Sequence, residues 1–249
     1  MSTAHAVSAT KAATPPVKAW RVALTVNALV AGVALAIKFG EAATAADPHF
    51  SSVFGRLANE LCYFTIQSNM IVFGVCGALA WRPERWRAIA GVPRLVGLVC
   101  ITVTGIVYYA LLAGDQHFVG IAKVGDILAH AVSPLLYVGT WLVLGPRGHL
   151  RRQHARQMLV FPLFWVGLTL VRGAFIHLYP YDFVDVRTNG YVAVIVMIAT
   201  LTAAAAGLGT AAVSFDMRRT QLVIRPFRTR PVTRVAELAL PHRGSPADR

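Results

Sequence analysis

Two short polar clusters interrupt apolar stretches of the sequence, and together they contain the groups that acyl transfer requires. Thr65, Ser68 and Asn69 are spaced i, i+3 and i+4, so they share one face of a helix. Asp126 and His130 are i, i+4 neighbours, so the carboxylate can orient the imidazole. A threonine hydroxyl needs an adjacent general base, usually a neutral histidine. The spacing therefore predicts Thr65 as nucleophile, His130 as base and Asp126 as its support.

Neighbouring side chains are candidates for the supporting roles. A hydroxyl or amide beside the nucleophile can donate to a tetrahedral oxyanion, and three residues qualify: Ser68, Gln67 and Asn69. A further apolar stretch ends in residues that are candidates to bind substrate: Arg172, His177, Tyr179 and Tyr181. Arginine binds carboxylates through two parallel hydrogen bonds, so we expect Arg172 to hold a substrate carboxylate.

Structural roles are open for the same residues. Thr65 and Ser68 can bond the carbonyl four residues back, and His130 can bridge two helices. Asp126 can be a solvated acid favoured by a helix dipole. Cys62 is a competing nucleophile, although a free cysteine is often a buried apolar side chain.

The arginine and the aromatic run have structural alternatives too. Arg172 can pair with Asp182 or Asp185 to hold helix ends together. Residues 179–183 also fit an aromatic belt at a membrane interface.

The composition excludes a soluble domain. Of 249 residues, 56% are hydrophobic and only 14% are charged. Six apolar stretches are long enough to cross a bilayer, since about 20 helical residues span its core. We therefore predict an all-α polytopic membrane protein with six transmembrane helices in residues 19–215, at about 19–39, 59–80, 94–113, 122–145, 158–179 and 190–213.

The net charge of +13 reports topology rather than nucleic-acid binding. Basic residues precede the first predicted span and fill the connections after the second and fourth spans, whereas most acidic residues lie on the opposite side. The positive-inside rule then places both termini in the cytoplasm. Residues 1–18 are predicted to form a disordered cytoplasmic tail, and residues 216–249 a basic cytoplasmic tail.

The predicted topology places the polar residues at one depth. With a rise of 1.5 Å per residue, Thr65, His130 and Arg172 lie about 9, 12 and 10 Å below the outer ends of their spans. Polar groups in hydrocarbon are costly, so three spans that concentrate them at one level predict a shared cavity in the outer half of the membrane.

Three short segments carry a family resemblance. They are residues 63–69 (YFTIQSN), 128–134 (LAHAVSP) and 179–183 (YPYDF), in this order on the second, fourth and fifth predicted spans. With these segments the chain, from about residue 20 to 215, resembles the bacterial branch of the androgen-induced membrane protein family.

The resemblance implies a threonine hydrolase. Animal members cleave fatty acid esters of hydroxy fatty acids with an intramembrane threonine and histidine, and these match Thr65 and His130 by position. It also implies a lipid ester as substrate, membrane lipids as partners and the bacterial plasma membrane as location. Two features depart from the family pattern: residues 67–69 are more polar, and Arg172 stands where a histidine is expected.

Two other classes remain open. A lipid carrier or transporter would use the same cavity without covalent chemistry, although inverted repeats are not evident in the sequence. A haem electron carrier would need axial ligands such as His130 and His177. The sequence predicts neither a metal nor a cofactor, because its three cysteines are not in Cys-x-x-Cys spacing.

Overall fold

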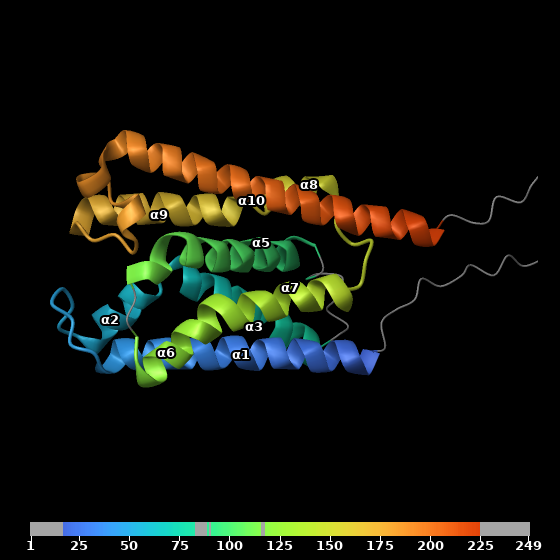
Figure 1. Cartoon of the computed structure of the whole chain (residues 1–249), viewed down its shortest axis with the longest axis horizontal. Helices are drawn as coiled ribbons and strands as arrows, with labels where there is room; N and C mark the ends of the chain where they lie inside the picture. Colours follow the sequence, from blue (N-terminus) through green and yellow to red (C-terminus); the bar gives the residue numbers. More distant parts are fainter. Residues whose placement is uncertain (1–16, 83–88, 90, 116–117, 225–249) are drawn as a thin grey trace, which may run out of the picture.

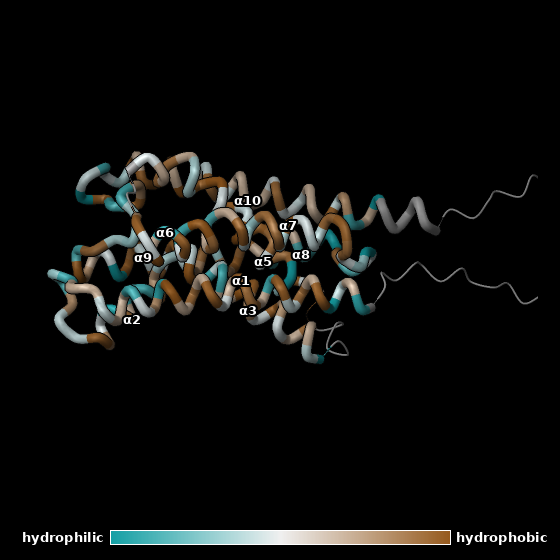
Figure 2. Tube along the Cα trace, turned by 60° about the horizontal axis from the view of Figure 1, so that its bottom comes forward, coloured by the Kyte–Doolittle hydropathy of each residue, from teal (hydrophilic) through white to brown (hydrophobic). Residues whose placement is uncertain are grey.

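Six antiparallel helical spans build the molecule (Figure 1). The computed structural model describes residues 17–82, 89, 91–115 and 118–224. Within these residues there are helices and connections but no strands, and six helices are long and apolar enough to cross a membrane. Their apolar residues concentrate along the middle of the bundle (Figure 2). The prediction of an all-α integral membrane protein with six spans is therefore confirmed.

The spans follow one another along the chain as hydrophobicity predicted. The first four consist of α1 (Val17–Thr44), α3 (Phe64–Trp81), α5 (Val92–Val107) with the π-turn η2 (Tyr108–Leu112), and α6 (Gly120–Ile127) with the π-turn η4 (Leu128–Val132) and α7 (Ser133–Val143). The last two are α9 (Val160–Ile176) and α10 (Val186–Ile224). Short elements connect them: α2 (Val53–Glu60), the 3₁₀ turns η3 (Ala113–Asp115) and η5 (Asp182–Val184), and α8 (Arg152–Gln157).

The packing divides the bundle into a central group and an outer pair. Helix α1 contacts α3, α6 and α7, and α5 contacts α3, α7 and α10. Helices α9 and α10 lie together on the opposite side of α5 from α1 (Figure 1). The side of α5 that faces this pair is where an elongated cavity can form.

Three predicted boundaries change. The second span begins at Phe64 rather than at residue 59, because α2 is a separate short helix capped by Ser52 and without buried residues. Thr65 therefore lies in the first turn of its helix and not two turns inside it. The fifth span ends at Ile176, where His177 adopts a left-handed conformation, and Gly190 interrupts the start of α10.

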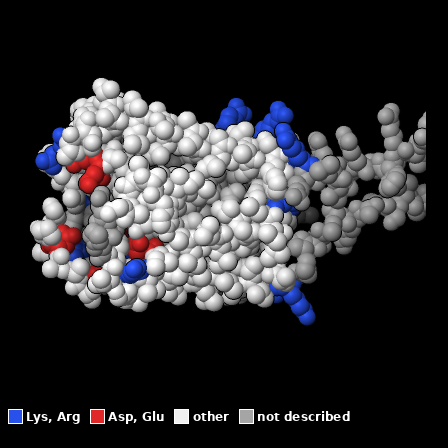
Figure 3. Space-filling view, viewed as in Figure 1, with Lys and Arg blue, Asp and Glu red and all other residues white. Residues whose placement is uncertain are grey.

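The predicted tails fall largely outside the described residues. Helix α1 already begins at Val17, and α10 continues to Ile224, so residues 216–224 extend the last helix instead of beginning a tail. On the face seen in Figure 3, acidic side chains gather at the end opposite the described termini, and Lys and Arg project from the terminal end.

A buried carboxylate organises the terminal end of the bundle. Asp216 on α10 is fully buried, and its Oδ2 accepts hydrogen bonds from the backbone N–H groups of Gly148, His149 and Leu150 at 3.0, 3.0 and 2.9 Å. This contact fixes the connection between α7 and α8 to the last span.

Candidate active site

Three residues predicted from the sequence meet in a buried chain of polar contacts. The Oγ1 of Thr65 lies 3.2 Å from the Nε2 of His130, and the Nδ1 of His130 lies 2.9 Å from the Oδ1 of Asp126. Their exposed fractions are 8%, 9% and 7%. The structure therefore brings together a hydroxyl, an imidazole and a carboxylate in the order that base-assisted attack requires.

The surroundings of His130 determine which ring nitrogen carries the proton. Its Nδ1 faces two acceptors, the carboxylate of Asp126 and the backbone carbonyl of the same residue at 3.1 Å. The carbonyl satisfies hydrogen-bond geometry, whereas the carboxylate is close enough to act through its charge. Because both neighbours are acceptors, a neutral His130 holds its proton on Nδ1, which leaves Nε2 free to accept from Thr65.

Tyr108 completes this group, and sequence reasoning missed it. Its hydroxyl donates to the Oδ2 of Asp126 at 2.5 Å, and its ring stacks on His130 with a centroid distance of 3.8 Å and an interplanar angle of 13°. A tyrosine inside a membrane span needs a partner for its hydroxyl, which is the signal that could have identified it.

Two facing π-turns present these side chains to each other. Tyr108 opens η2, and His130 lies in the middle of η4. Gly105 allows the approach, because a Cβ there would lie 3.2 Å from the carbonyl oxygen of His130. Pro134 follows η4, and because a proline cannot accommodate a regular hydrogen bond to the carbonyl four residues back, that of His130, it accounts for the altered backbone there.

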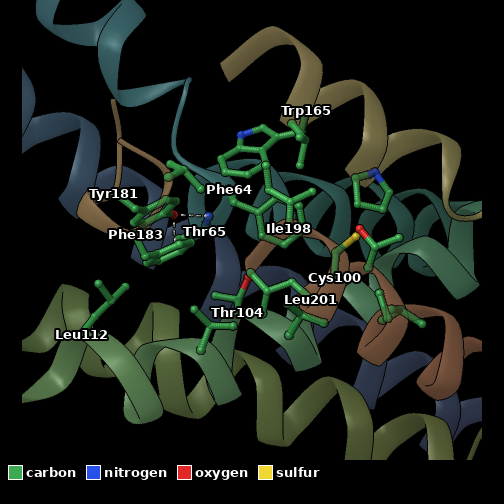
Figure 4. Close-up of a pocket in the computed structure, with 18 residues that line it drawn as sticks. Phe64, Thr65, Cys100, Thr104, Leu112, Trp165, Tyr181, Phe183, Ile198 and Leu201 are labelled. Atoms are coloured by element: carbon green, nitrogen blue, oxygen red, sulfur yellow. Dashed lines mark hydrogen bonds between the residues drawn. The ribbon is translucent and has the colours of Figure 1, made fainter. Parts of the chain in front are cut away.

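Tyr181 reaches Thr65 from the connection between α9 and α10. Its hydroxyl accepts from the backbone N–H of Thr65 at 3.2 Å and lies 3.2 Å from the Thr65 Oγ1 (Figure 4). Phe183 stacks on its ring, and Tyr63 makes an edge contact with it. Burial raises the pKa of Tyr181 to about 12, so the phenol is a neutral donor at physiological pH.

The three residues predicted to bind an oxyanion are directed elsewhere. The Asn69 amide donates to the carbonyls of Thr65 and Ala129, which ties α3 to η4. Ser68 accepts from Thr104 on α5, and the Gln67 amide donates to the carbonyl of Leu61. These side chains fix the helices, whereas the Tyr181 hydroxyl contacts both the backbone N–H and the Oγ1 of Thr65.

Arg172, the predicted substrate-binding cation, contacts residues at the end of α9 and on α2. Its guanidinium donates to the Oδ1 of Asn59 at 2.6 Å and to the carbonyl of Leu178 at 3.3 Å. Neither contact is with Asp182 or Asp185, the acids that were its structural alternative.

Three other candidates lie away from the nucleophile. His177 is exposed at the end of α9, and the ring of Tyr179 packs where a Cβ on Gly173 would lie. The thiol of Cys62, the competing nucleophile, donates to the carbonyl of Ala58.

Two cavities meet at Thr65. A polar vestibule of about 510 Å³ contains Lys38, Glu41, Glu60, Asp126 and His130 in its lining. An apolar pocket of about 80 Å³ lies between α3, α5, α9 and α10. Thr65, Leu112 and Tyr181 line both. In Figure 4, Thr65 and Tyr181 lie at one end of the apolar pocket and Cys100 at the other.

The vestibule contains a carboxyl group, that of Glu60, whose pKa lies above its ordinary value. Burial raises the pKa of Glu60 from 4.5 to about 7, and the negative charge of Glu41 adds to this effect while Lys38 opposes it. Lys38 bonds Glu41 at 3.1 Å and lies over the ring of Phe118. The second cation, Arg56, donates to four backbone carbonyls.

We expect Glu60 to make the stability of the protein depend on pH. A carboxyl whose pKa is higher in the folded state loses folding stability as pH rises from its ordinary pKa through the raised value, here from 4.5 to about 7. The unfolding temperature of the wild type should therefore fall over this interval, and a Glu60→Gln variant should show a smaller decline. Parallel curves for the two proteins would contradict the prediction.

Searches with protein-family models, among curated proteins and among solved structures each find no match to this chain.

Proposed function

We propose that the protein is a membrane-embedded hydrolase of lipid esters, with Thr65 as nucleophile and His130 as general base. The observation that carries this proposal is the contact between the Thr65 Oγ1 and the His130 Nε2 at the junction of a polar and an apolar cavity. An ester of a long-chain acid has the same division, with an apolar acyl chain on one side of the carbonyl and a more polar alcohol on the other.

The first half of the reaction forms an acyl-threonine. His130 takes the hydroxyl proton as the Thr65 oxygen attacks the ester carbonyl. The Thr65 N–H and the Tyr181 hydroxyl are placed to donate to the oxyanion, and the negative charge of Asp126 stabilises the imidazolium. The tetrahedral intermediate then collapses, and His130 returns the proton to the departing alcohol.

The second half releases the acid. Water enters from the vestibule, gives a proton to His130 and attacks the acyl-threonine. Collapse of the second tetrahedral intermediate breaks the bond to Thr65, whose oxygen regains the proton from His130. The products are one alcohol and one fatty acid.

The resemblance to the androgen-induced membrane protein family makes fatty acid esters of hydroxy fatty acids the first substrates to test. Their free carboxylate would lie in the vestibule, where Lys38 is the ammonium group near Asp126. Lys38, and not Arg172, is therefore the cation that we assign to such a carboxylate.

The apolar pocket predicts a preference for acyl chains of medium length. Its lining extends from Val99 to Val107 on α5 and from Ile198 to Ala205 on α10, or about 12 and 10 Å along the helices. Its volume is that needed by about six water molecules. A fully extended chain advances about 1.2 Å per bond, so hydrolysis should be fastest near about 8 carbons.

Ala205→Leu should shift this optimum to shorter chains, whereas Ala204→Leu on the exposed face should not.

A lipid carrier is the alternative that the two cavities also accommodate. A carrier has no need for a base in contact with a buried hydroxyl, so this contact favours the hydrolase. A haem carrier is less well supported, because His130 is engaged on both ring nitrogens and His177 lies at the exposed end of α9.

We further propose that both termini are cytoplasmic and that the protein resides in the bacterial plasma membrane. The basic end of the bundle is the end at which the described chain begins and ends (Figure 3), and the positive-inside rule assigns that end to the cytoplasm. The vestibule would then face the outer side.

Product analysis of the purified full-length chain tests the function. The detergent-solubilised protein is incubated with esters that differ in acyl length and alcohol, including a fatty acid ester of a hydroxy fatty acid, and released acids are measured by mass spectrometry. Release by the wild type but not by Thr65→Ala supports the hydrolase. Absence of product from every ester, with a lipid bound to folded protein, would replace it with the carrier.

A further inference from the structure

A basic groove lies at the opposite end of the bundle from Thr65, between α8 and α10. Its volume is about 720 Å³, and three arginines contribute to its lining: Arg152, Arg156 and Arg218. Lys and Arg side chains project from this end of the molecule in Figure 3. The groove is separate from both cavities of the candidate active site.

Helical spacing directs two sets of side chains into this groove. On α8, Arg152, Ala155 and Arg156 are spaced i, i+3 and i+4. On α10, Thr210, Ser214 and Arg218 are spaced i, i+4 and i+8, so hydroxyl groups continue the line toward the third arginine. Val213 and Met217 add an apolar wall.

Among the described residues, the groove has a positive charge without a counter-charge. In the part of the chain that the structure describes, no carboxylate lines it and the three guanidinium groups have no hydrogen-bond or ion-pair partner. Asp216 on the same helix is buried and accepts from the backbone N–H groups of residues 148–150. Exposed arginines held together without a counter-charge favour an anionic ligand, and their planar groups match phosphate oxygens.

We propose that this groove binds the headgroup of an anionic phospholipid. Basic pockets between transmembrane helices at the membrane surface suit phosphate-bearing headgroups. Two observations favour a lipid over a soluble phosphate: the groove has apolar residues in its lining, and α9, which begins directly after α8, exposes Val160 and Leu163 to the surrounding acyl chains. The phosphate contacts the arginines, and the lipid tails lie along the apolar helices.

Lipid binding to the full-length protein in nanodiscs tests this proposal. Phosphatidylglycerol and phosphatidylcholine are compared as bound lipids by native mass spectrometry, with inorganic phosphate as a competitor. A variant with Arg152→Gln, Arg156→Gln and Arg218→Gln should lose affinity for phosphatidylglycerol by about fivefold per arginine, or about a hundredfold in total. Phosphatidylcholine binding should change little.

The matched control removes the same number of charges at the same end. The control variant combines Lys18→Gln, Arg21→Gln and Arg82→Gln. These residues lie on α1 or directly after α3 and do not line the groove, so the variant should keep wild-type binding of phosphatidylglycerol. Equal losses of phosphatidylglycerol affinity in both triple variants would show that diffuse surface charge, and not the groove, binds the lipid. Full competition by inorganic phosphate would identify an anion site without lipid specificity. If the groove variant fails to fold, Arg156→Glu alone should still reduce phosphatidylglycerol binding, and wild-type binding by this folded variant would overturn the proposal.

Discussion

Replacing Thr65 with alanine is expected to lower kcat for ester hydrolysis by about 10⁴ or more, and His130→Ala should have a similar effect. In the proposed mechanism Thr65 supplies the attacking oxygen, and His130, whose Nε2 lies 3.2 Å from that oxygen, is the base. Because the two residues act as a unit, the double variant should be little worse than either single variant. Single-turnover measurements with a chromogenic ester give the rate of the chemical step directly.

Thr65→Ser is the matched control for this prediction. Serine keeps the attacking hydroxyl and loses only a methyl group, so it should retain much of the wild-type rate, and the acyl-enzyme should be detectable on the peptide that contains residue 65. Wild-type activity in a folded Thr65→Ala variant would exclude this residue as the nucleophile. If the rate losses of the two single variants add up in the double variant, the two residues do not act as a unit.

The largest expected effect on stability is that of Asp216→Ala. Its buried carboxylate accepts three backbone hydrogen bonds, and the variant leaves these donors unsatisfied in the connection between α7 and α8. Hydrogen bonds to charged groups are strong and buried orphan donors are costly, so the loss should be about 3–5 kcal/mol. Thermal unfolding in detergent measures it as a lower midpoint.

Asp216→Asn separates the contribution of charge from that of the acceptor. The amide oxygen can still accept from part of the 148–150 backbone, so this variant should be destabilised less than Asp216→Ala. Equal midpoints for wild type and Asp216→Ala would show that other contacts hold this connection.

Hydrophobicity alone was sufficient to predict the six spans, because each apolar stretch is long enough to cross a bilayer and charged connections separate them. The contact between Asp126 and His130 was also predictable, since an i, i+4 pair depends only on local geometry. The contact between Thr65 and His130 required a further assumption, that two polar faces at one depth turn toward each other.

Contacts that depend on helix rotation and on connections were not predictable. Tyr108 reaches Asp126 from the end of α5, where η2 begins, and no spacing in the sequence indicates this contact between two spans. Arg172 bonds Asn59, which lies on the separate short helix α2. Asn69 was a candidate oxyanion donor, yet its amide donates to the backbone carbonyls of Thr65 and Ala129.

The two π-turns make the alignment of the site sensitive to the insertion or deletion of a single residue. A π-turn contains one residue more than an α-helical turn, so deleting one residue from 128–132 would restore a regular helix. Everything on one side of the deletion would then rotate by about 100° relative to the other side. Asp126 would turn away from Tyr108 while Pro134 and Tyr137 kept their packing against α5. A chain with such a deletion would retain six apolar spans and lose the alignment of its polar centre, so insertions and deletions within this short segment distinguish homologous chains that keep the site from those that keep only the bundle.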